Sequence, residues 1–321
     1  MPPKILLTRR WPDAVEAHLR QRYDVTVDPG DRPLSAADLT EAMGRYDAIC
    51  PTVTDRLGAA ILAAPNARVR ILGNFGAGFE HIDLDAAKAA GIVVTNTPDV
   101  LTDATADLAI LLMLMASRRA GEGERELRAG RWTGWRPTHL LGQGLAGKRL
   151  GLVGFGRIAQ ATAARARAFG LSIAYYSRRR ADVGVEAALD ATHVDSLEEL
   201  AATSDVLSLH CPGGPATRHL VNAALLARMK PTAILVNTAR GTVVNEADLI
   251  VALSSGAIAA AGLDVFEGEP AVNPGLIALP NAVLLPHLGS ATLETRTAMG
   301  MRVAANLDRF FAGEVPHDRV A

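Results

Sequence analysis

A glycine-rich turn near the middle of the chain constrains its fold most strongly. Residues 148–160 read KRLGLVGFGRIAQ, in which a short apolar run leads to Gly154, Phe155 and Gly156, and an alanine-rich helical pattern follows through Phe169. A strand, a tight glycine turn and a helix start in this order are typical of dinucleotide-binding domains. Roughly half of the 321 residues precede the turn, so the sequence predicts that another domain is built first.

On both sides of the turn, short β-rich runs alternate with helical runs. Before residue 98 the predicted strands are Lys4–Leu7, Val25–Val27, Ala48–Ile49, Arg70–Gly73 and Ile92–Thr95, and the predicted helices are Ala14–Arg20, Ala36–Met43, Ala59–Ala64 and Asp85–Ala90. Beyond the turn the predicted strands are Leu150–Val153, Ser172–Tyr176, Val206–Leu209, Ala233–Asn237, Ala259–Gly262 and Ala282–Leu285. This rhythm predicts an α/β protein with two Rossmann-like or flavodoxin-like domains, each built on a parallel sheet.

The predicted C-terminal helix, Ser290 through Phe311, leaves too little chain for a domain of its own. We expect it to pack on the N-terminal domain. The nucleotide domain, 98–287, would then be inserted in a discontinuous substrate domain made of 1–97 plus 288–321. Within the inserted domain, the strongly apolar helix Asp103–Arg119 is expected either in the core or at a subunit interface. After Gly121 the chain becomes polar, and we expect it to be irregular.

Composition excludes several classes of function. The formal net charge is -1 and no block is dense in lysine or arginine, so a nucleic-acid partner is not expected. The only cysteines, Cys50 and Cys211, give no disulfide framework, and no Cys/His cluster has the spacing of metal ligands. The longest apolar stretch, Leu108 to Ala116, is too short to cross a bilayer, and the N-terminal apolar run is too short for a signal peptide. We expect a soluble cytoplasmic protein.

The residues of the glycine turn each have a physical role in binding a pyrophosphate. Gly154 permits the tight turn, and Gly156 lets the backbone approach the phosphates. Ala159 is the small residue that allows the helix to pack closely on the strand. Amides at the start of that helix face the phosphates, and the helix dipole adds to the attraction.

The end of the next strand indicates which dinucleotide is bound. A site selective for NAD places Asp or Glu there, to accept hydrogen bonds from the ribose hydroxyls. This chain has Ser177, Arg178 and Arg179 instead, with no acidic residue before Asp182. Serine and arginine can bind a 2′-phosphate that a carboxylate would repel. A solvated basic loop is the alternative, but the position at a strand end favours NADP(H), with NAD(H) as the second choice.

Further strand ends carry the groups that a nicotinamide enzyme acting on a 2-oxo acid needs. A cation must hold the substrate carboxylate, an acid must protonate the carbonyl oxygen, and a carboxylate must orient that acid. Arg240 supplies the cation, although an isolated arginine more often pairs with a surface carboxylate. His210 competes with His287 as the acid, and Glu267 competes with Glu269 as its partner. Position alone does not separate these candidates.

Almost the whole chain resembles the D-isomer-specific 2-hydroxyacid dehydrogenases, and most closely their glyoxylate/hydroxypyruvate reductase branch. The matching motifs are Gly154–Ile158, Asn237–Gly241, Gly262–Phe266, Glu269–Pro270 and Pro286–Thr292. The resemblance implies that Arg240, Glu269 and His287 are catalytic, with His287 as the acid in reduction. It removes His210 and Glu267 as catalytic candidates.

The resemblance also implies the ligand contacts. Backbone amides of Ala77 and Gly78, in the loop Asn74–His81, would bind the substrate carboxylate together with Arg240 and His287, although the same glycines suit a plain turn. Glu80 stands where the family more often has Asp. Asp264, which can also cap a turn, would help to position the nicotinamide. The expected cofactor contacts are Gly154, Phe155, Gly156, Arg157, Ile158, Ser177, Arg178, Arg179, Cys211, Pro212, Thr238, Ala239, Arg240, Asp264, His287 and Gly289.

The helix at about 103–119 resembles the dimerisation element of the family, which implies a homodimer. The segment after it, with Trp132 and Trp135, resembles one that can reach the active site of the partner. In one related pattern a tryptophan occupies the position of His139.

The implied function is NADPH-dependent reduction of small 2-oxo acids, such as glyoxylate and hydroxypyruvate, to 2-hydroxy acids. Oxidation of phosphite or of larger D-2-hydroxy acids on the same scaffold is the main alternative. Formate dehydrogenases resemble this chain but carry Gln in place of Glu269, which argues against formate. A dinucleotide-gated binding module, like the corepressors among these relatives, is a further alternative, disfavoured because no basic segment or long disordered flank is evident.

Overall fold

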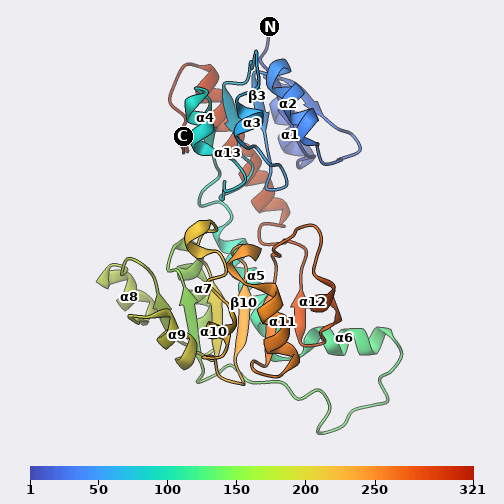
Figure 1. Ribbon diagram of the computed structural model, residues 1–321, viewed down its shortest axis with the longest axis vertical. Coiled ribbons are helices and arrows are strands. Elements are labelled where there is room, and N and C mark those ends of the chain that lie inside the picture. The colour runs from blue at the N-terminus through green and yellow to red at the C-terminus, as the bar shows by residue number, and fades with distance from the viewer. The chain divides into compact units, whose positions relative to one another are not determined.

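The computed structural model describes residues 1–321 and consists of two compact units (Figure 1). Unit 1 comprises Met1–Leu101 and Ser290–Ala321, and unit 2 comprises Thr102–Gly289. Each unit is built on one sheet whose neighbouring strands all run parallel, which confirms the predicted α/β fold class. No helix is both long enough and apolar enough to span a membrane.

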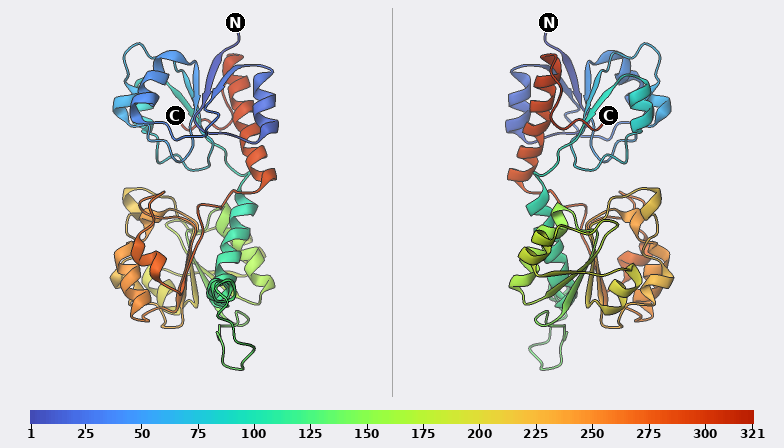
Figure 2. Two further views of the ribbon diagram at one scale, coloured as in Figure 1. Left: turned by 90° about the vertical axis from the view of Figure 1, so that its right-hand side faces the viewer. Right: turned by 90° about the vertical axis from the view of Figure 1, so that its left-hand side faces the viewer.

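Unit 1 contains a 5-stranded sheet in the order β2-β1-β3-β4-β5. Its strands are β1 (Lys4–Leu7), β2 (Asp24–Val27), β3 (Ala48–Cys50), β4 (Ile71–Gly73) and β5 (Val93–Thr95). Helices α1 (Asp13–Arg20) and α13 (Leu293–Phe311) bury their apolar side chains on one face of the sheet. Helices α2 (Ala36–Arg45), α3 (Ala59–Leu62) and α4 (Leu84–Ala89) cover the other face, and Figure 2 shows this three-layer arrangement.

Unit 2 contains a 7-stranded sheet in the order β12-β11-β10-β9-β6-β7-β8. Its strands are β6 (Arg149–Val153), β7 (Ser172–Tyr176), β8 (Ala191–His193), β9 (Val206–Leu209), β10 (Ile234–Asn237), β11 (Ala260–Leu263) and β12 (Ala282–Leu284). On one face lie α5 (Thr102–Ser117), α7 (Arg157–Ala168) and α8 (Val183–Leu189). On the other lie α9 (Leu197–Thr203), α10 (Ala223–Leu226), α11 (Glu246–Ser254) and α12 (Pro274–Ala278).

The segment after Gly121, expected to be irregular, begins with a helix, so that prediction is wrong up to Arg128; residues 129–148 form no helix or strand, which confirms it for the rest of the segment. Helix α6 (Ala120–Arg128) follows a left-handed turn at Arg119, whose φ is 52°. Ion pairs one turn apart stabilise it, between Arg119 and Glu122 and between Arg128 and Glu124. None of its residues is buried, so the periodic apolar stripe that reveals a core-facing helix is missing from its sequence.

Strand β8 was not predicted either. It is a 3-residue edge strand that pairs with β7 and contains Thr192 and His193. A strand this short and polar gives no alternating apolar pattern. The parallel sheet brings the C-terminal ends of all the strands of unit 2 to one edge, where the loops with the predicted site residues begin.

Candidate active site

In the glycine turn at the end of β6, the position of Gly154 is too tightly packed to accept a side chain. Gly154 has a φ of 85°, and a Cβ there would lie 3.0 Å from the carbonyl carbon of His210. Phe155 is buried and stacks on Tyr175, with ring centroids 3.9 Å apart, so its side chain faces the interior. Gly156 caps α7 without any side-chain hydrogen bond, and no atom lies within 4 Å of its Cβ position. The first turn of α7 therefore presents uncapped amides beside open space, which suits phosphate oxygens.

The loop after β7 contains three consecutive arginines, Arg178 to Arg180, of which only Arg180 is paired with a carboxylate. Arg180 donates through Nε and Nη2 to Glu186, at 2.9 Å each, and Tyr175 donates its hydroxyl to the same carboxylate at 2.6 Å. These hydrogen bonds lower the pKa of Glu186 to about 2, so Arg180 has a charged partner. Arg178 and Arg179 are exposed to solvent like Arg180, but neither forms an ion pair with a carboxylate.

Ser177 lies at the start of this loop and donates its hydroxyl to the carbonyl of Arg179. This bond folds the loop back on itself directly after β7. Of the three arginines at this strand end, Arg178 and Arg179 are thus the two without a carboxylate partner.

The end of β9 lies against the glycine turn. His210 Nε2 is 2.9 Å from Ser208 Oγ, and burial lowers the pKa of His210 to about 4. Burial also raises the pKa of the Cys211 thiol to about 11. Both side chains are therefore neutral near pH 7. Pro212 continues the loop, and its carbonyl accepts the hydroxyl of Thr217 at 2.7 Å.

Arg240 lies in a turn that the side chain of Asn237 closes at the end of β10. Asn237 Oδ1 accepts from the Ala239 amide at 3.0 Å, and Asn237 Nδ2 donates to the Arg240 carbonyl at 2.9 Å. The Arg240 guanidinium donates to the Ala239 carbonyl at 2.7 Å. At the next residue, Gly241, a Cβ would lie 1.9 Å from the carbonyl carbon of Phe266. Only glycine therefore lets this turn pack on the loop after β11.

Thr238, in the same turn, has a buried Oγ1 with no hydrogen-bond partner. A buried hydroxyl left without a partner costs about 1–3 kcal/mol, so such a group points to a missing ligand atom. Together with the uncapped start of α7, this hydroxyl fits a dinucleotide bound along the C-terminal edge of the sheet.

His287 and Glu269 form a close pair in unit 2. His287 Nδ1 lies 2.7 Å from Glu269 Oε2, and the two side chains are 33% and 31% exposed. The other oxygen, Glu269 Oε1, accepts from the Phe266 amide at 2.8 Å. Burial favours the neutral acid, but the hydrogen bond and charge of His287, the Phe266 amide and the charge of Arg240 outweigh it and lower the pKa of Glu269. The carboxylate is thus ionised near neutral pH, and Nε2 is the ring nitrogen that Glu269 leaves open.

Asp264 holds the backbone on which His287 sits. Its carboxylate is buried and accepts from the amides of Leu288 at 2.7 Å and Gly289 at 2.8 Å, while its carbonyl accepts from the His287 amide at 2.9 Å. Burial raises the pKa of Asp264 to about 6, against the opposing effect of the two amides and of the His287 charge. Asp264 therefore caps the loop after β12 rather than the turn that follows it in the sequence. The Gly289 carbonyl in turn accepts the hydroxyl of Thr105 at 3.0 Å.

The competing carboxylate, Glu267, belongs to a separate cluster. It accepts from Arg218 Nη2 at 2.7 Å and lies 2.9 Å from His219 Nε2. Its own amide donates to Glu246 at 2.7 Å. Sequence reasoning missed Arg218, His219 and Glu246, because they lie far from Glu267 in the chain and carry no recognisable spacing.

In unit 1, the loop Asn74–His81 follows β4, and two asparagine side chains donate hydrogen bonds to its backbone carbonyls. Asn74 is fully buried and its Nδ2 donates to the carbonyls of Gly76 at 3.1 Å and Gly78 at 2.9 Å. Asn96 Nδ2 donates to the carbonyl of Ala77 at 2.7 Å. Neither asparagine was singled out from the sequence as a functional residue.

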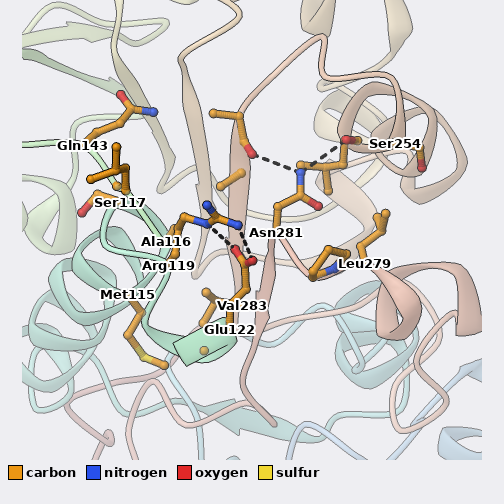
Figure 3. A pocket seen from close by; sticks show the side chains of 17 residues that line it. Met115, Ala116, Ser117, Arg119, Glu122, Gln143, Ser254, Leu279, Asn281 and Val283 are labelled. Atoms are coloured by element: carbon orange, nitrogen blue, oxygen red, sulfur yellow. Dashed lines mark hydrogen bonds and ion pairs between the residues drawn. The ribbon is translucent and has the colours of Figure 1, made fainter. Parts of the chain in front are cut away.

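A cavity of about 490 Å³ lies at the opposite edge of the unit 2 sheet, away from these residues (Figure 3). The chain leading into β11 and β12 lines it, at Ala259 and Asn281, together with the end of α5 and the Arg119–Glu122 ion pair. No predicted site residue borders it. The cavity is therefore separate from the candidate active site.

Known proteins resemble this chain along its whole length. Residues 110–289 match the family model described as the NAD-binding domain of D-isomer specific 2-hydroxyacid dehydrogenases. The glyoxylate reductase of Thermococcus litoralis is 45% identical over 100% of this chain and 97% of its own. A solved structure from Thermus thermophilus has a TM-score of 0.92 at 41% identity, covering 99% of this chain and 100% of the other. The NADPH-dependent glyoxylate/hydroxypyruvate reductase of Sinorhizobium meliloti, solved with NADP and malonate, has a TM-score of 0.88 at 38% identity, over 100% and 97%.

Proposed function

The chain belongs to the D-isomer specific 2-hydroxyacid dehydrogenase family, and from that premise we propose that it reduces small 2-oxo acids with NADPH. Glyoxylate and hydroxypyruvate are the proposed substrates, because the similar proteins from Thermococcus litoralis and Sinorhizobium meliloti bear those names. The single observation that carries the proposal is the pairing of His287 Nδ1 with Glu269 Oε2 at 2.7 Å, within reach of the Arg240 charge.

The cofactor would be held along the C-terminal edge of the unit 2 sheet. The uncapped turn of α7, with Gly156, Arg157 and Ile158, would receive the pyrophosphate, and the orphan hydroxyl of Thr238 supports a ligand at the end of β10. Further contacts are proposed for Cys211, Pro212, Ala239, Asp264 and Gly289. When bound, NADPH supplies the hydride for reduction.

NADPH is preferred in this proposal because of the loop after β7. Arg178 and Arg179 are exposed at the position where a 2′-phosphate would lie, and no carboxylate stands there to bind ribose hydroxyls. Arg180 is not included because Glu186 already neutralises it. A charge-assisted contact to phosphate contributes about 1.5–3 kcal/mol when well formed, which is enough to discriminate NADPH from NADH.

The proton is assigned to His287. Since Nδ1 is held by the ionised Glu269, Nε2 is the nitrogen that would donate to the carbonyl oxygen of the substrate. Glu269 stabilises the protonated ring and fixes its orientation. The neutral His210, hydrogen-bonded to Ser208, lacks a carboxylate partner and is not suited to this role.

Arg240 would bind the substrate carboxylate and polarise its carbonyl. The turn closed by Asn237 fixes the Arg240 backbone, and Gly241 packs it against the loop that carries Glu269. In unit 1, we propose that the amides of Ala77 and Gly78 also bind a carboxylate oxygen, as a backbone anion site.

The direct test is a panel of initial rates with NADPH and NADH against glyoxylate, hydroxypyruvate and larger 2-oxo acids, with phosphite-dependent reduction of NADP⁺ measured alongside. The proposal predicts rapid oxidation of NADPH with at least one small 2-oxo acid and none with phosphite. If the enzyme turned over phosphite and no 2-oxo acid, the proposed reaction would be wrong and phosphite oxidation would take its place. A protein that binds NADPH but turns over nothing would support a binding module instead.

A homodimer is part of the proposal, because the arm formed by α6 and the residues up to Leu141 leaves large apolar side chains in solvent. Leu127 is 62% exposed, Trp132 52%, Trp135 81% and Leu141 64%. Several large apolar side chains exposed along one segment are typical of an interface. Sedimentation velocity should give a dimer that Leu127→Glu combined with Trp135→Glu converts to monomer. A monomeric wild-type protein would contradict the proposal.

A further inference from the structure

In the loop Asn74–His81 of unit 1, hydrogen bonds to the backbone carbonyls fix the orientation of the peptide groups. The Gly76 carbonyl accepts from Asn74 Nδ2 at 3.1 Å and from the Thr97 amide at 2.9 Å. The Ala77 carbonyl accepts from Asn96 Nδ2 at 2.7 Å, and the Gly78 carbonyl accepts from Asn74 Nδ2 at 2.9 Å. Three successive carbonyls of the loop are thus each hydrogen-bonded to another group of unit 1.

This arrangement fixes the direction of the amides. In a planar trans peptide the C=O and the following N–H point in opposite directions. Holding the carbonyls of Gly76 and Ala77 therefore turns the N–H groups of Ala77 and Gly78 away from the groups that hold those carbonyls, and holding the Gly78 carbonyl does the same for the Phe79 N–H. No acceptor of the chain receives the Ala77 or Gly78 amide. Adjacent amides that point the same way form an anion-binding concavity.

His81 holds the Asn74 side chain in the orientation that this role requires. Its Nε2 lies 3.0 Å from Asn74 Oδ1, and both side chains are buried. Because Asn74 uses Nδ2 for the two carbonyls, Oδ1 is its acceptor, so the His81 proton is on Nε2. An amide flipped by 180° would set Nδ2 against that N–H, leave the Gly78 carbonyl without a donor and leave the Gly76 carbonyl with the Thr97 amide alone.

We propose that Asn74 and Asn96, with His81 behind Asn74, are positioning residues that preorganise the Ala77 and Gly78 amides for a carboxylate. They do not touch the substrate; they hold the carbonyls away from it, so that a carboxylate meets donors rather than acceptors. The inference rests on the proposed function for the identity of the substrate, a 2-oxo acid, but the anion site is a property of unit 1. Preorganisation of this kind removes the cost of reorienting dipoles on binding.

The test uses Asn74→Asp, which keeps the size of the side chain and replaces the donor by an acceptor, and Asn96→Ala, which removes the donor to Ala77 alone. Asn66→Asp is the matched control, because Asn66 is exposed in the same unit and bonds to none of these groups. With NADPH at saturation, we expect the KM for the 2-oxo acid and the inhibition constant of oxamate to rise about 10- to 100-fold in the first two variants. The Kd for NADPH should be unchanged and kcat should fall by less than KM rises.

Binding is also followed at the amides themselves, by ¹⁵N NMR of the full-length protein with NADPH and oxamate. Oxamate should shift the Ala77 and Gly78 amide signals in wild type, and Asn96→Ala should weaken the response most at Gly78, whose N–H shares a peptide group with the Ala77 carbonyl. If the buried carboxylate of Asn74→Asp prevents folding, Asn96→Ala alone decides.

Two results would overturn the inference: wild-type amides that do not respond to oxamate, or variants that bind oxamate as tightly as wild type. A wild-type protein whose amides respond but which reduces no 2-oxo acid would contradict the proposed function and leave the anion site supported.

Discussion

Replacing Glu269 by Gln isolates the contribution of its charge to the protonation of His287. The carboxylate oxygen lies 2.7 Å from His287 Nδ1, which puts the centres of charge about 4 Å apart. At that separation an ion pair contributes about 1 kcal/mol in water and about 4 kcal/mol at the effective dielectric constant of a protein surface. Because both side chains are about one-third exposed, we expect a value between these limits, about 1.5–3 kcal/mol.

The sign follows from which protonation state reduces the substrate. Reduction needs the protonated imidazole, so activity is present at low pH and is lost as the pH rises. Glu269 stabilises that protonated form, so its removal should move the alkaline limb of kcat/KM to lower pH. Because the pKa of Glu269 is itself lowered, mainly by His287 acting against burial, its contribution is lost only below the usual glutamate range.

The assay is the pH profile of kcat/KM for glyoxylate in wild type and Glu269→Gln. Glu267→Gln is the matched control, because Glu267 lies on the same loop but binds Arg218 and His219. The control should keep the position of the alkaline limb. Identical profiles for Glu269→Gln and wild type would refute the assignment of Glu269 to the proton path.

Three further predictions follow from the same geometry. Arg240→Ala should lower kcat/KM for 2-oxo acids by about 10²-fold or more, since a charge-assisted contact to the substrate carboxylate is lost; an unchanged value would remove Arg240 from the site. Replacing Arg178 and Arg179 together by Ser should raise the KM for NADPH about 10-fold or more and leave that for NADH nearly constant, whereas equal effects on both would show that the loop does not read the 2′-phosphate. Gly241→Ala should destabilise the fold by about 1–3 kcal/mol, because the added Cβ would lie 1.9 Å from the Phe266 carbonyl carbon; a wild-type Tm would contradict that packing.

The sheets and the glycine turn could be predicted because their signals are local. Apolar β-branched runs mark the strands, and Gly154 and Gly156 stand directly between one strand and one helix. Helix α6 could not be predicted, because it buries no residue and contains two glycines in nine positions. Its stability comes from charge pairs on its surface and leaves no apolar period to detect.

The candidate site could be predicted only in part, because its key contacts are not local in the sequence. The residue types at the strand ends were visible, but the pairs that give them their roles span long stretches of chain, as in Glu269 with His287 and Asp264 with Gly289. From residue types and positions alone, His210 and His287 were therefore equal candidates for the catalytic acid, and only the family resemblance favoured His287. The structure separates them by chemistry, since His287 has a carboxylate partner and His210 a serine.

The buried asparagines of unit 1 could not be predicted from the sequence either. Asn74 and Asn96 bind backbone carbonyls, and a side chain that bonds to a backbone group leaves no mark on residue spacing. Only coordinates reveal that they face the peptide groups of Gly76, Ala77 and Gly78.

We propose that the His287–Glu269 pair carries out proton transfer in the reduction of a 2-oxo acid. The most direct measurement compares kcat/KM for glyoxylate with NADPH between His287→Gln and His210→Gln, the same substitution at the two strand-end histidines. We predict that His287→Gln loses about 10²- to 10⁴-fold, the usual contribution of a general acid, while His210→Gln stays within a few-fold of wild type. Full activity in His287→Gln, or an equal loss in both variants, would contradict the account.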